Sequence, residues 1–266
     1  MAEERRPVKL IAVWQVKYVM QISATQIEMF CRCPQQYYRR YICKEIIPPG
    51  IAMVQGSAVH KAASVNFQQK INSKQDLPVD DLVDCAVTEF DDQVKKYGIK
   101  TSGEDKDVVV TWTRAHAHMQ APNYMPAAVE TKLTMPVPEV DGCSLIAILD
   151  LISDDGAIID FKNKTRRLDD DAAARSTQLA VYDYAFRKHF GRRPKKLALD
   201  VLAGHKNVTR QFLAVDSSDD RIERMFIRRA QALLRAIQTG TFPPCDPTSW
   251  MCNPKWCGYY DSCPYV

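Results

Sequence analysis

The sequence predicts an α/β domain, because strand-like and helix-like segments follow one another along its 266 residues. Two neighbouring segments rich in branched apolar residues, 145–153 and 157–162, flank Asp154-Asp155-Gly156 and predict an antiparallel hairpin. Amphipathic segments before and after this hairpin predict helices. A hydrophobic content of 46% is ample for a buried core, so one large domain is expected.

The hairpin brings two acidic side chains together if its loop has three residues. A type I turn closed by Gly156 in the left-handed region makes Ser153 face Ala157, which sets Asp150 opposite Asp160. A two-residue turn would instead put the two aspartates on opposite faces of the hairpin. We expect the three-residue loop, because it unites the charged residues on one face.

Alternation along the second strand puts Lys162 on the face of Asp160, while the Phe161 side chain points away and leaves its carbonyl at the sheet edge. Two carboxylates about one side chain apart repel each other unless a proton or a cation lies between them. Hard divalent ions such as Mg²⁺ and Mn²⁺ take such oxygen ligands. Ordinary charges on a solvated strand are the alternative, which the flanking apolar residues disfavour because they indicate a buried strand.

The chain begins with an expected N-terminal arm, residues 1–22, followed by two short helices within 23–42. Ser23 with Gln26, or Thr25 with Glu28, forms a capping box for the first helix, and Pro34 starts the second. The second helix mixes tyrosines with arginines, which suits base stacking and phosphate pairing but also fits an amphipathic helix with half-buried tyrosines. Its candidates for DNA contact are Tyr37, Arg39 and Arg40.

Two prolines and Gly50 interrupt the chain, and a helix is predicted from about Gly56 to Ile71. His60 lies on this helix. A single histidine on a helix is usually a packed or surface residue, so the residue itself gives only a weak indication of a metal site.

An α-helical insertion is predicted over about 73–125, with helices at 79–97 and 108–120 separated by a polar loop. An alternating strand at 128–137 leads into the hairpin. Glu130 on this strand is either an extra acidic residue of the site or a surface glutamate paired with Lys132.

A helix is predicted over 169–190, where Gln178 and Tyr182 lie one turn apart on one face. An amide and a phenol in this arrangement can orient a water molecule or a phosphate. The basic stretch that follows could track a phosphate backbone, and Arg192 and Arg193 are its candidates for DNA contact. The remaining predicted elements are strands at 195–203 and 208–215 and an amphipathic helix at 219–239.

Residues 240–266 form a cysteine-rich segment without a helix or strand period. It contains Cys245, Cys252, Cys257 and Cys263. The chain has nine cysteines, an odd number, and no expected export signal, which favours thiolates on a metal over a disulfide framework. Zinc and iron–sulfur both fit four local cysteines.

These motifs resemble the PD-(D/E)xK nuclease superfamily, and the resemblance extends from Ser23 to Cys263. Three motifs match its RecB-like branch in order and spacing: G-x-x-x-H at Gly56 to His60, D…(D/E)xK at Asp150 with Asp160-Phe161-Lys162, and Q-x-x-x-Y at Gln178 to Tyr182. The resemblance implies a restriction-endonuclease-like fold, with a mixed central sheet flanked by helices.

The resemblance also implies metal-assisted hydrolysis of phosphodiester bonds. It assigns one or two Mg²⁺ or Mn²⁺ ions to His60, Asp150, Asp160, the Phe161 carbonyl and, as a further candidate, Glu130. It assigns catalytic or orienting roles to Lys162, Gln178 and Tyr182. We expect a DNA exonuclease acting on linear ends or single strands in recombination, repair or phage DNA processing, with a recombinase or helicase as a candidate partner.

Iron–sulfur members of the branch, which include the AddB nuclease domain and CRISPR-associated adaptation nucleases, hold a 4Fe-4S cluster with one cysteine near the start of the domain and three near its end. Cys33, in a Cys-Pro pair, matches the first, and Cys252, Cys257 and Cys263 match the others. Four residues separate Cys252 from Cys257 where two are usual, so Cys245 is the alternative ligand. Structural zinc is the alternative metal.

The formal net charge of +4 permits a nucleic-acid partner without indicating one. Runs of 18 or more apolar residues are absent, so we expect no membrane span and a cytoplasmic protein of a bacterial or phage-infected cell. Two other classes of function stay open: a catalytically weak DNA-binding or adaptor protein with a structural metal cluster, and a redox-responsive adaptor.

Overall fold

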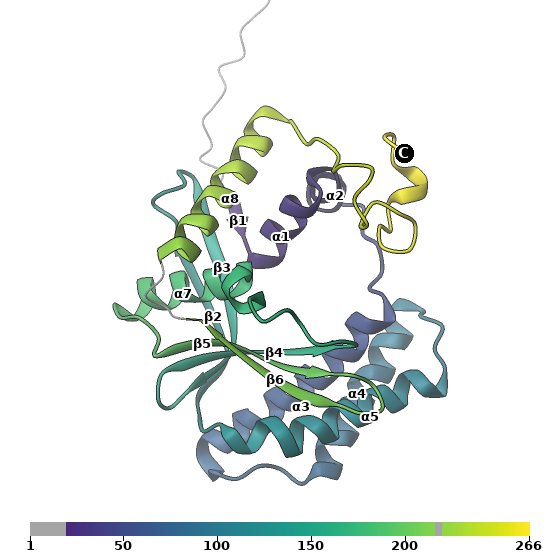
Figure 1. The fold of residues 1–266 in the computed structure, drawn as a ribbon, viewed down its shortest axis with the longest axis vertical. Coiled ribbons are helices and arrows are strands. Elements are labelled where there is room, and N and C mark those ends of the chain that lie inside the picture. Colours follow the sequence, from purple (N-terminus) through teal and green to yellow (C-terminus); the bar gives the residue numbers. More distant parts are fainter. Residues whose placement is uncertain (1–19, 216–219) are drawn as a thin grey trace, which may run out of the picture.

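A six-stranded mixed sheet forms the centre of the domain in the computed structural model, which describes residues 20–215 and 220–266 (Figure 1). Strands β1, β3, β4, β5 and β6 follow one another in the sheet, and β2 pairs with β3. The parallel pairs are β1 with β3 and β4 with β5. The strands are β1 Met20–Ile22, β2 Pro126–Pro136, β3 Cys143–Ser153, β4 Ala157–Lys164, β5 Lys196–Ala203 and β6 Thr209–Val215. The predicted mixed sheet is therefore confirmed.

The β3–β4 hairpin has the predicted three-residue loop. Leu151 pairs with Ile159, and Ile152 pairs with Ile158, so the same register sets Asp150 across from Asp160. The loop closes with Gly156 at φ 83°, and its N–H donates to the Ser153 carbonyl at 2.9 Å. This turn chemistry decides which side chains share a face.

Helices cover both faces of the sheet, as expected. On one face the main core joins the sheet to α1 (Ala24–Arg32), α7 (Thr177–Phe190) and α8 (Asp220–Thr239). On the other face, α3 (Ile51–Ser73) packs its Ala63 and Phe67 against Phe161 and Ile159 of β4. The predicted insertion holds α4 (Val79–Tyr97) and α5 (Gly103–Ala115), which share a separate core with α3.

Three predicted helix bounds are wrong, and each error is explained by a capping feature. Helix α3 begins at Ile51 rather than near Gly56, because Gly50 is its N-cap directly after two prolines. Helix α5 begins at Gly103 rather than 108, because Ser102 and Asp105 form a capping box. The predicted helix 169–190 is two helices, α6 (Ala172–Arg175) and α7, because Ser176 caps α7 by accepting from the Leu179 N–H at 3.2 Å.

The two ends of the domain meet on α2 (Pro34–Tyr37) and η1 (Tyr38–Ile42), beside which the C-terminal segment runs in turns (Figure 1). Gln36 donates to Cys257 Sγ at 3.0 Å, and Arg39 donates to the Tyr259 carbonyl at 3.1 Å. The last three residues of the predicted arm are β1, and the remainder of the arm, 1–19, lies outside the described residues. Within residues 20–215 and 220–266, no helix is long and apolar enough to cross a bilayer.

Gly156→Ala should lower the free energy of unfolding by about 1 to 2 kcal/mol, because a Cβ is disfavoured in the left-handed region. Its Cβ would also lie 3.2 Å from Nη1 of Arg192, which must move. The matched control is Gly56→Ala, where a Cβ meets nothing within 4 Å inside α3. We expect the free energy of unfolding of Gly56→Ala, measured with urea, to rise by about 0.5 to 1 kcal/mol. Equal effects of the two substitutions would contradict the turn assignment.

Candidate active site

The candidate active site lies where β4 separates from β3. β2 pairs with β3 along the whole of one edge, so β1 and β4 share the other edge. On this edge of β3, β4 pairs only with Leu151 and Ile152, and β1 pairs only with the residues from Cys143 to Leu145. Asp150 sits at this fork, and its Oδ2 accepts the Phe161 N–H of the departing strand at 3.1 Å. The carboxylate thus satisfies a backbone donor that has lost its strand partner.

Asp160 is fully buried beside a cation. Lys162 Nζ lies 2.8 Å from Asp160 Oδ2, whereas Oδ1 has no hydrogen-bond partner in the described part of the chain. A buried carboxylate oxygen without a partner is unfavourable unless a proton or cation joins it. The fork therefore presents an acidic site that is short of positive charge.

A chain of polar contacts holds these groups in place. Lys162 Nζ donates to Gln178 Oε1 at 2.7 Å, and Gln178 Nε2 donates to the Tyr182 hydroxyl at 2.6 Å. The Tyr182 hydroxyl donates in turn to Asp150 Oδ1 at 3.4 Å. The two α7 side chains, one turn apart, connect the lysine of β4 to the aspartate of β3. The structure thus brings together all five residues predicted to be catalytic.

Burial raises the pKa of both Asp150 and Asp160 to about 6, against the opposing effect of Lys162. The negative charge of Asp150 raises the pKa of Asp160 further. Burial lowers the pKa of Lys162, but the two aspartates outweigh it and raise this pKa overall, so the ammonium is charged at neutral pH. Lys162 is therefore suited to stabilise negative charge on a bound group.

His60 approaches this site from α3. Its Nδ1 lies 3.5 Å from Asp150 Oδ2, and the ring is half-buried. Burial, followed by the charge of Lys162, lowers the pKa of His60. The neutral imidazole that results is the form that can ligate a metal.

Glu130 faces the fork from β2 in a strained conformation. It lies between the register pairs Thr131 with Leu149 and Val129 with Leu151, which places it opposite Asp150, and its φ is 47°. Left-handed φ at a residue other than glycine is uncommon and gathers at functional sites. Burial raises the pKa of Glu130, and its charge raises the pKa of Asp150.

Glu28 of α1 is a site residue that was not predicted. It is exposed at the helix surface, yet desolvation by the surrounding protein raises its pKa, and the charges that act on it most are Lys162 and Asp160. In the sequence it is one polar residue of an amphipathic helix. Only the passage of β1 into α1 beside the fork brings it near the site, and no local pattern signals this.

As they stand, no three His, Cys, Asp or Glu side chains in the described ranges are placed to hold one metal ion. At the fork, the ammonium of Lys162 occupies the position beside Asp160. The donor set nevertheless fits a hard divalent cation, because Asp160 Oδ1 lacks a partner, both carboxylates are buried and His60 is neutral. Asp150, Asp160, His60 and the Phe161 carbonyl are the groups that could hold it.

All five predicted metal-binding thiols line one small cavity of about 30 Å³ between α2 and the C-terminal segment: Cys33, Cys245, Cys252, Cys257 and Cys263. Burial and the neighbouring thiols of Cys33 and Cys252 raise the pKa of Cys245. Cys245 is thus as much a part of this cavity as the other four, and the geometry does not distinguish it from Cys33 as a ligand. The chemistry of the site, several thiols around one small cavity, fits zinc or an iron–sulfur cluster.

The predicted DNA contacts are only partly consistent with the structure. Tyr37 is 3% exposed and packs on Phe30 and Phe242, so it cannot stack on a base, and that prediction is wrong. Arg39 donates to Glu45 at 2.7 Å and to backbone and side chains of the C-terminal segment, so its guanidinium acts within the protein. Arg40 lines an open groove, described below.

Arg192 and Arg193 lie away from the fork. Arg192 packs over the Phe186 ring and against Gly156, at the turn end of the hairpin. That turn is about 13 Å along the strand from Asp160. Arg193 pairs with Asp220 at 2.9 Å. The structure does not bring these two arginines to the fork.

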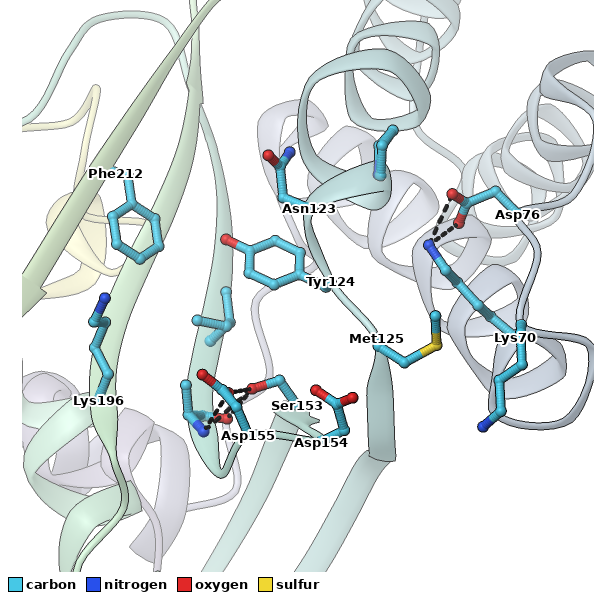
Figure 2. Close-up of a pocket in the computed structure, with 14 residues that line it drawn as sticks. Lys70, Asp76, Asn123, Tyr124, Met125, Ser153, Asp154, Asp155, Lys196 and Phe212 are labelled. Atoms are coloured by element: carbon cyan, nitrogen blue, oxygen red, sulfur yellow. Dashed lines mark hydrogen bonds and ion pairs between the residues drawn. The ribbon is translucent and has the colours of Figure 1, made fainter.

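A second open cavity, about 650 Å³ in volume, also lies at the turn end of the hairpin (Figure 2). Tyr124 and Phe212 point into it, and Ser153 and the two aspartates that follow form its floor. Lys70 is bound to Asp76 at its rim. None of the fork residues lines this cavity, so it is separate from the candidate active site.

In a metal chelator, the free energy of unfolding should fall as the pH rises from about 4 to about 6. Asp150 and Asp160 have raised pKa values in the folded protein, so the folded state binds more protons than the unfolded state in this range. Asp160→Asn should reduce the dependence of the free energy of unfolding on pH. At pH 7 this variant should be on the order of 1 to 3 kcal/mol more stable than the wild type. Urea unfolding of the wild type and of the variant at pH 4 to 8 measures both effects. Added Mn²⁺ should stabilise only the wild type.

Comparison with known proteins supports the interpretation of the fork. The sequence profile described as the PD-(D/E)XK nuclease superfamily matches residues 21–264. A comparison with curated proteins finds no match. The crystal structure of a candidate exonuclease from Eubacterium rectale is similar in fold, with a TM-score of 0.61 and 12% identity over 94% of this chain and 93% of that chain.

The crystal structure of SSO0001 has a TM-score of 0.44 and 16% identity over 92% of this chain and 86% of that chain, a similarity too low to carry an argument. The profile match covers most of the chain and includes both the fork and the cysteine cavity. From this match we conclude that the chain belongs to the PD-(D/E)XK nuclease superfamily.

Proposed function

We propose that this protein is a metal-dependent deoxyribonuclease of the RecB-like branch that hydrolyses phosphodiester bonds as an exonuclease. The observation that carries the proposal is the fork itself, where Asp150 and Asp160 are buried beside a charged Lys162. Family membership supports a nuclease, and DNA is its proposed substrate. We place the activity at linear ends or single strands, in recombination, repair or phage DNA processing.

Each fork residue has a proposed role in hydrolysis. Asp150, Asp160, His60 and the Phe161 carbonyl would hold Mg²⁺ or Mn²⁺, with Glu130 as a further oxygen donor. The ion would supply an activated water molecule and stabilise charge on the phosphate. Lys162, charged and held by Gln178, would neutralise the negative charge that develops on the phosphate oxygens.

Tyr182 and Gln178 would be positioning residues. Tyr182 holds Asp150 through its hydroxyl, and Gln178 orients both Tyr182 and Lys162 through the two ends of its amide. Because the three contacts form one chain, a change in either α7 residue should misplace both a metal ligand and the lysine.

We also propose that the cysteine cavity holds a 4Fe-4S cluster ligated by Cys33, Cys252, Cys257 and Cys263, with Cys245 as the alternative ligand and zinc as the alternative metal. The support is the shared cavity, which brings a thiol from α1's C-cap to thiols of the C-terminal segment. The cluster would act as a staple between the two ends of the domain.

Asp160→Ala and Lys162→Ala should each lower cleavage by at least about 100-fold, because both side chains act on the transition state. Binding of DNA should change little. The measurement is Mn²⁺-dependent digestion of end-labelled single-stranded and duplex DNA beside a covalently closed circle, which an exonuclease should leave intact. Asp154→Ala and Lys196→Ala, which alter the same residue types at the turn end, serve as matched controls. Wild-type protein that binds DNA without cutting any substrate would favour the DNA-binding adaptor instead.

Anaerobically purified protein should be brown and contain stoichiometric iron and sulfide if the cysteines hold the cluster. Cys33→Ser should lose iron and stability as fully as Cys263→Ser, since each would supply one ligand from a different end of the domain. Cys85→Ser, a thiol outside the cavity, is the control. Colourless protein with bound zinc would refute the iron–sulfur proposal. Full metal content in Cys33→Ser with loss in Cys245→Ser would make the metal site local to the C-terminal segment.

A further inference from the structure

A groove of about 640 Å³ separates α1 and η1 from α3 and α4; we call it the α1–α3 groove. Its first wall includes Met29, Arg32 and Arg40, and its second includes Met53 and the linker before α3. The C-terminal segment closes one end of it with Trp256 and Gly258. The groove adjoins the cysteine cavity, with which it shares Gln36 and Tyr259, and is distinct from the cavity at the hairpin turn.

The α1–α3 groove leads to the catalytic fork. Met53, Ser57 and His60 follow one another at four- and three-residue spacing, so they lie along one side of α3. The first two line the groove, and His60 contacts Asp150. The distance from Met53 to His60 along the helix is about 10 Å. A ligand lying in the groove would therefore reach the fork within a few residues of α3.

The two walls of the groove differ in charge. Arg32 and Arg40 are the charged groups that line the α1–η1 wall. The acidic residues of the groove, Glu89 and Asp92, both lie on α4 beside Lys96. An anionic backbone would therefore follow the arginine wall and avoid α4.

Apolar and aromatic side chains also line the groove. Ile46 and Met53 are 74% and 68% exposed, and Trp256 is 53% exposed, which is high for such large apolar groups. A groove that combines cations with exposed aromatic rings suits single-stranded nucleic acid, whose phosphates pair with arginine while its bases stack.

The cysteine segment sets the shape of the groove. Trp256 directly precedes Cys257, and Gly258 packs so closely on the linker that a Cβ there would lie 2.7 Å from Cγ2 of Ile47. Residues of the cysteine segment therefore border both the cysteine cavity and the groove.

We infer that the α1–α3 groove binds one strand of DNA and delivers it to the fork, with phosphates along Arg32 and Arg40 and a base stacked on Trp256. The inference deepens the proposed nuclease function and rests on it for the nature of the substrate. It assigns DNA contact to a surface that Tyr37 and Arg39 do not reach. It also gives the cysteine segment a part in holding substrate.

The test measures binding of a fluorescein-labelled oligothymidylate of 20 nucleotides by anisotropy, in a full-length Asp160→Asn background that prevents cleavage. Trp256→Ala should weaken binding about 5- to 150-fold, the range for loss of one stacked base. Trp256→Phe should restore most of it. Arg32→Gln with Arg40→Gln should reduce the slope of log affinity against log salt by about 1.4, since two phosphate contacts are lost. Arg114→Gln, on α5 outside the groove, is the matched control.

Iron and circular dichroism are recorded for each variant, so that loss of the cluster or of folding is seen separately. Unchanged affinity and salt slope in the folded groove variants would overturn the inference and favour a protein partner for the apolar wall. The inference would also be overturned if a duplex of the same length bound as tightly as the single strand and its affinity fell as much in the groove variants. Failure of the nuclease proposal would look different: protein with Asp160 intact would bind the oligonucleotide through the groove but would not cut it in the presence of Mn²⁺.

Discussion

The sharing of one edge of β3 by two strands is the constraint on which the candidate site depends. An edge shared by β1 and β4 leaves backbone groups of β4 without a strand partner at the point of separation. Asp150 supplies the missing acceptor to Phe161, and α7 fills the fork with the amide and phenol that hold Lys162. The same geometry that interrupts the sheet therefore gathers buried carboxylates and a cation at its centre.

The hairpin site could be predicted from the sequence because its geometry is local. A glycine in the right turn position fixes the register, and the register fixes which of Asp150, Phe161 and Asp160 share a face. Motif spacing on α3 and α7 was likewise informative, since helix periodicity sets which side chains can reach one spot. The mixed sheet was an implication of the family resemblance, whereas the individual helices and strands were predicted from periodic patterns.

What could not be predicted depends on tertiary contacts. Tyr37 belongs to a pattern that suits either base stacking or core packing, and only the position of Phe242, far along the chain, decides for the core. Glu28 joins the site because β1 delivers α1 to the fork. The strain at Glu130 depends on pairing with β3. None of these three outcomes has a signature within its own segment.

The contact between Gln36 and Cys257 spans 221 positions of the chain, and strands β2 to β6 with helices α3 to α8 lie within that interval. A metal shared by the two ends would close this interval as a cross-link. Closing a loop of that length removes about 5 kcal/mol of conformational entropy from the unfolded chain. Such a cross-link would stabilise every element inside the loop at once, so oxidative loss of the cofactor would loosen the catalytic sheet as much as the cysteine segment itself.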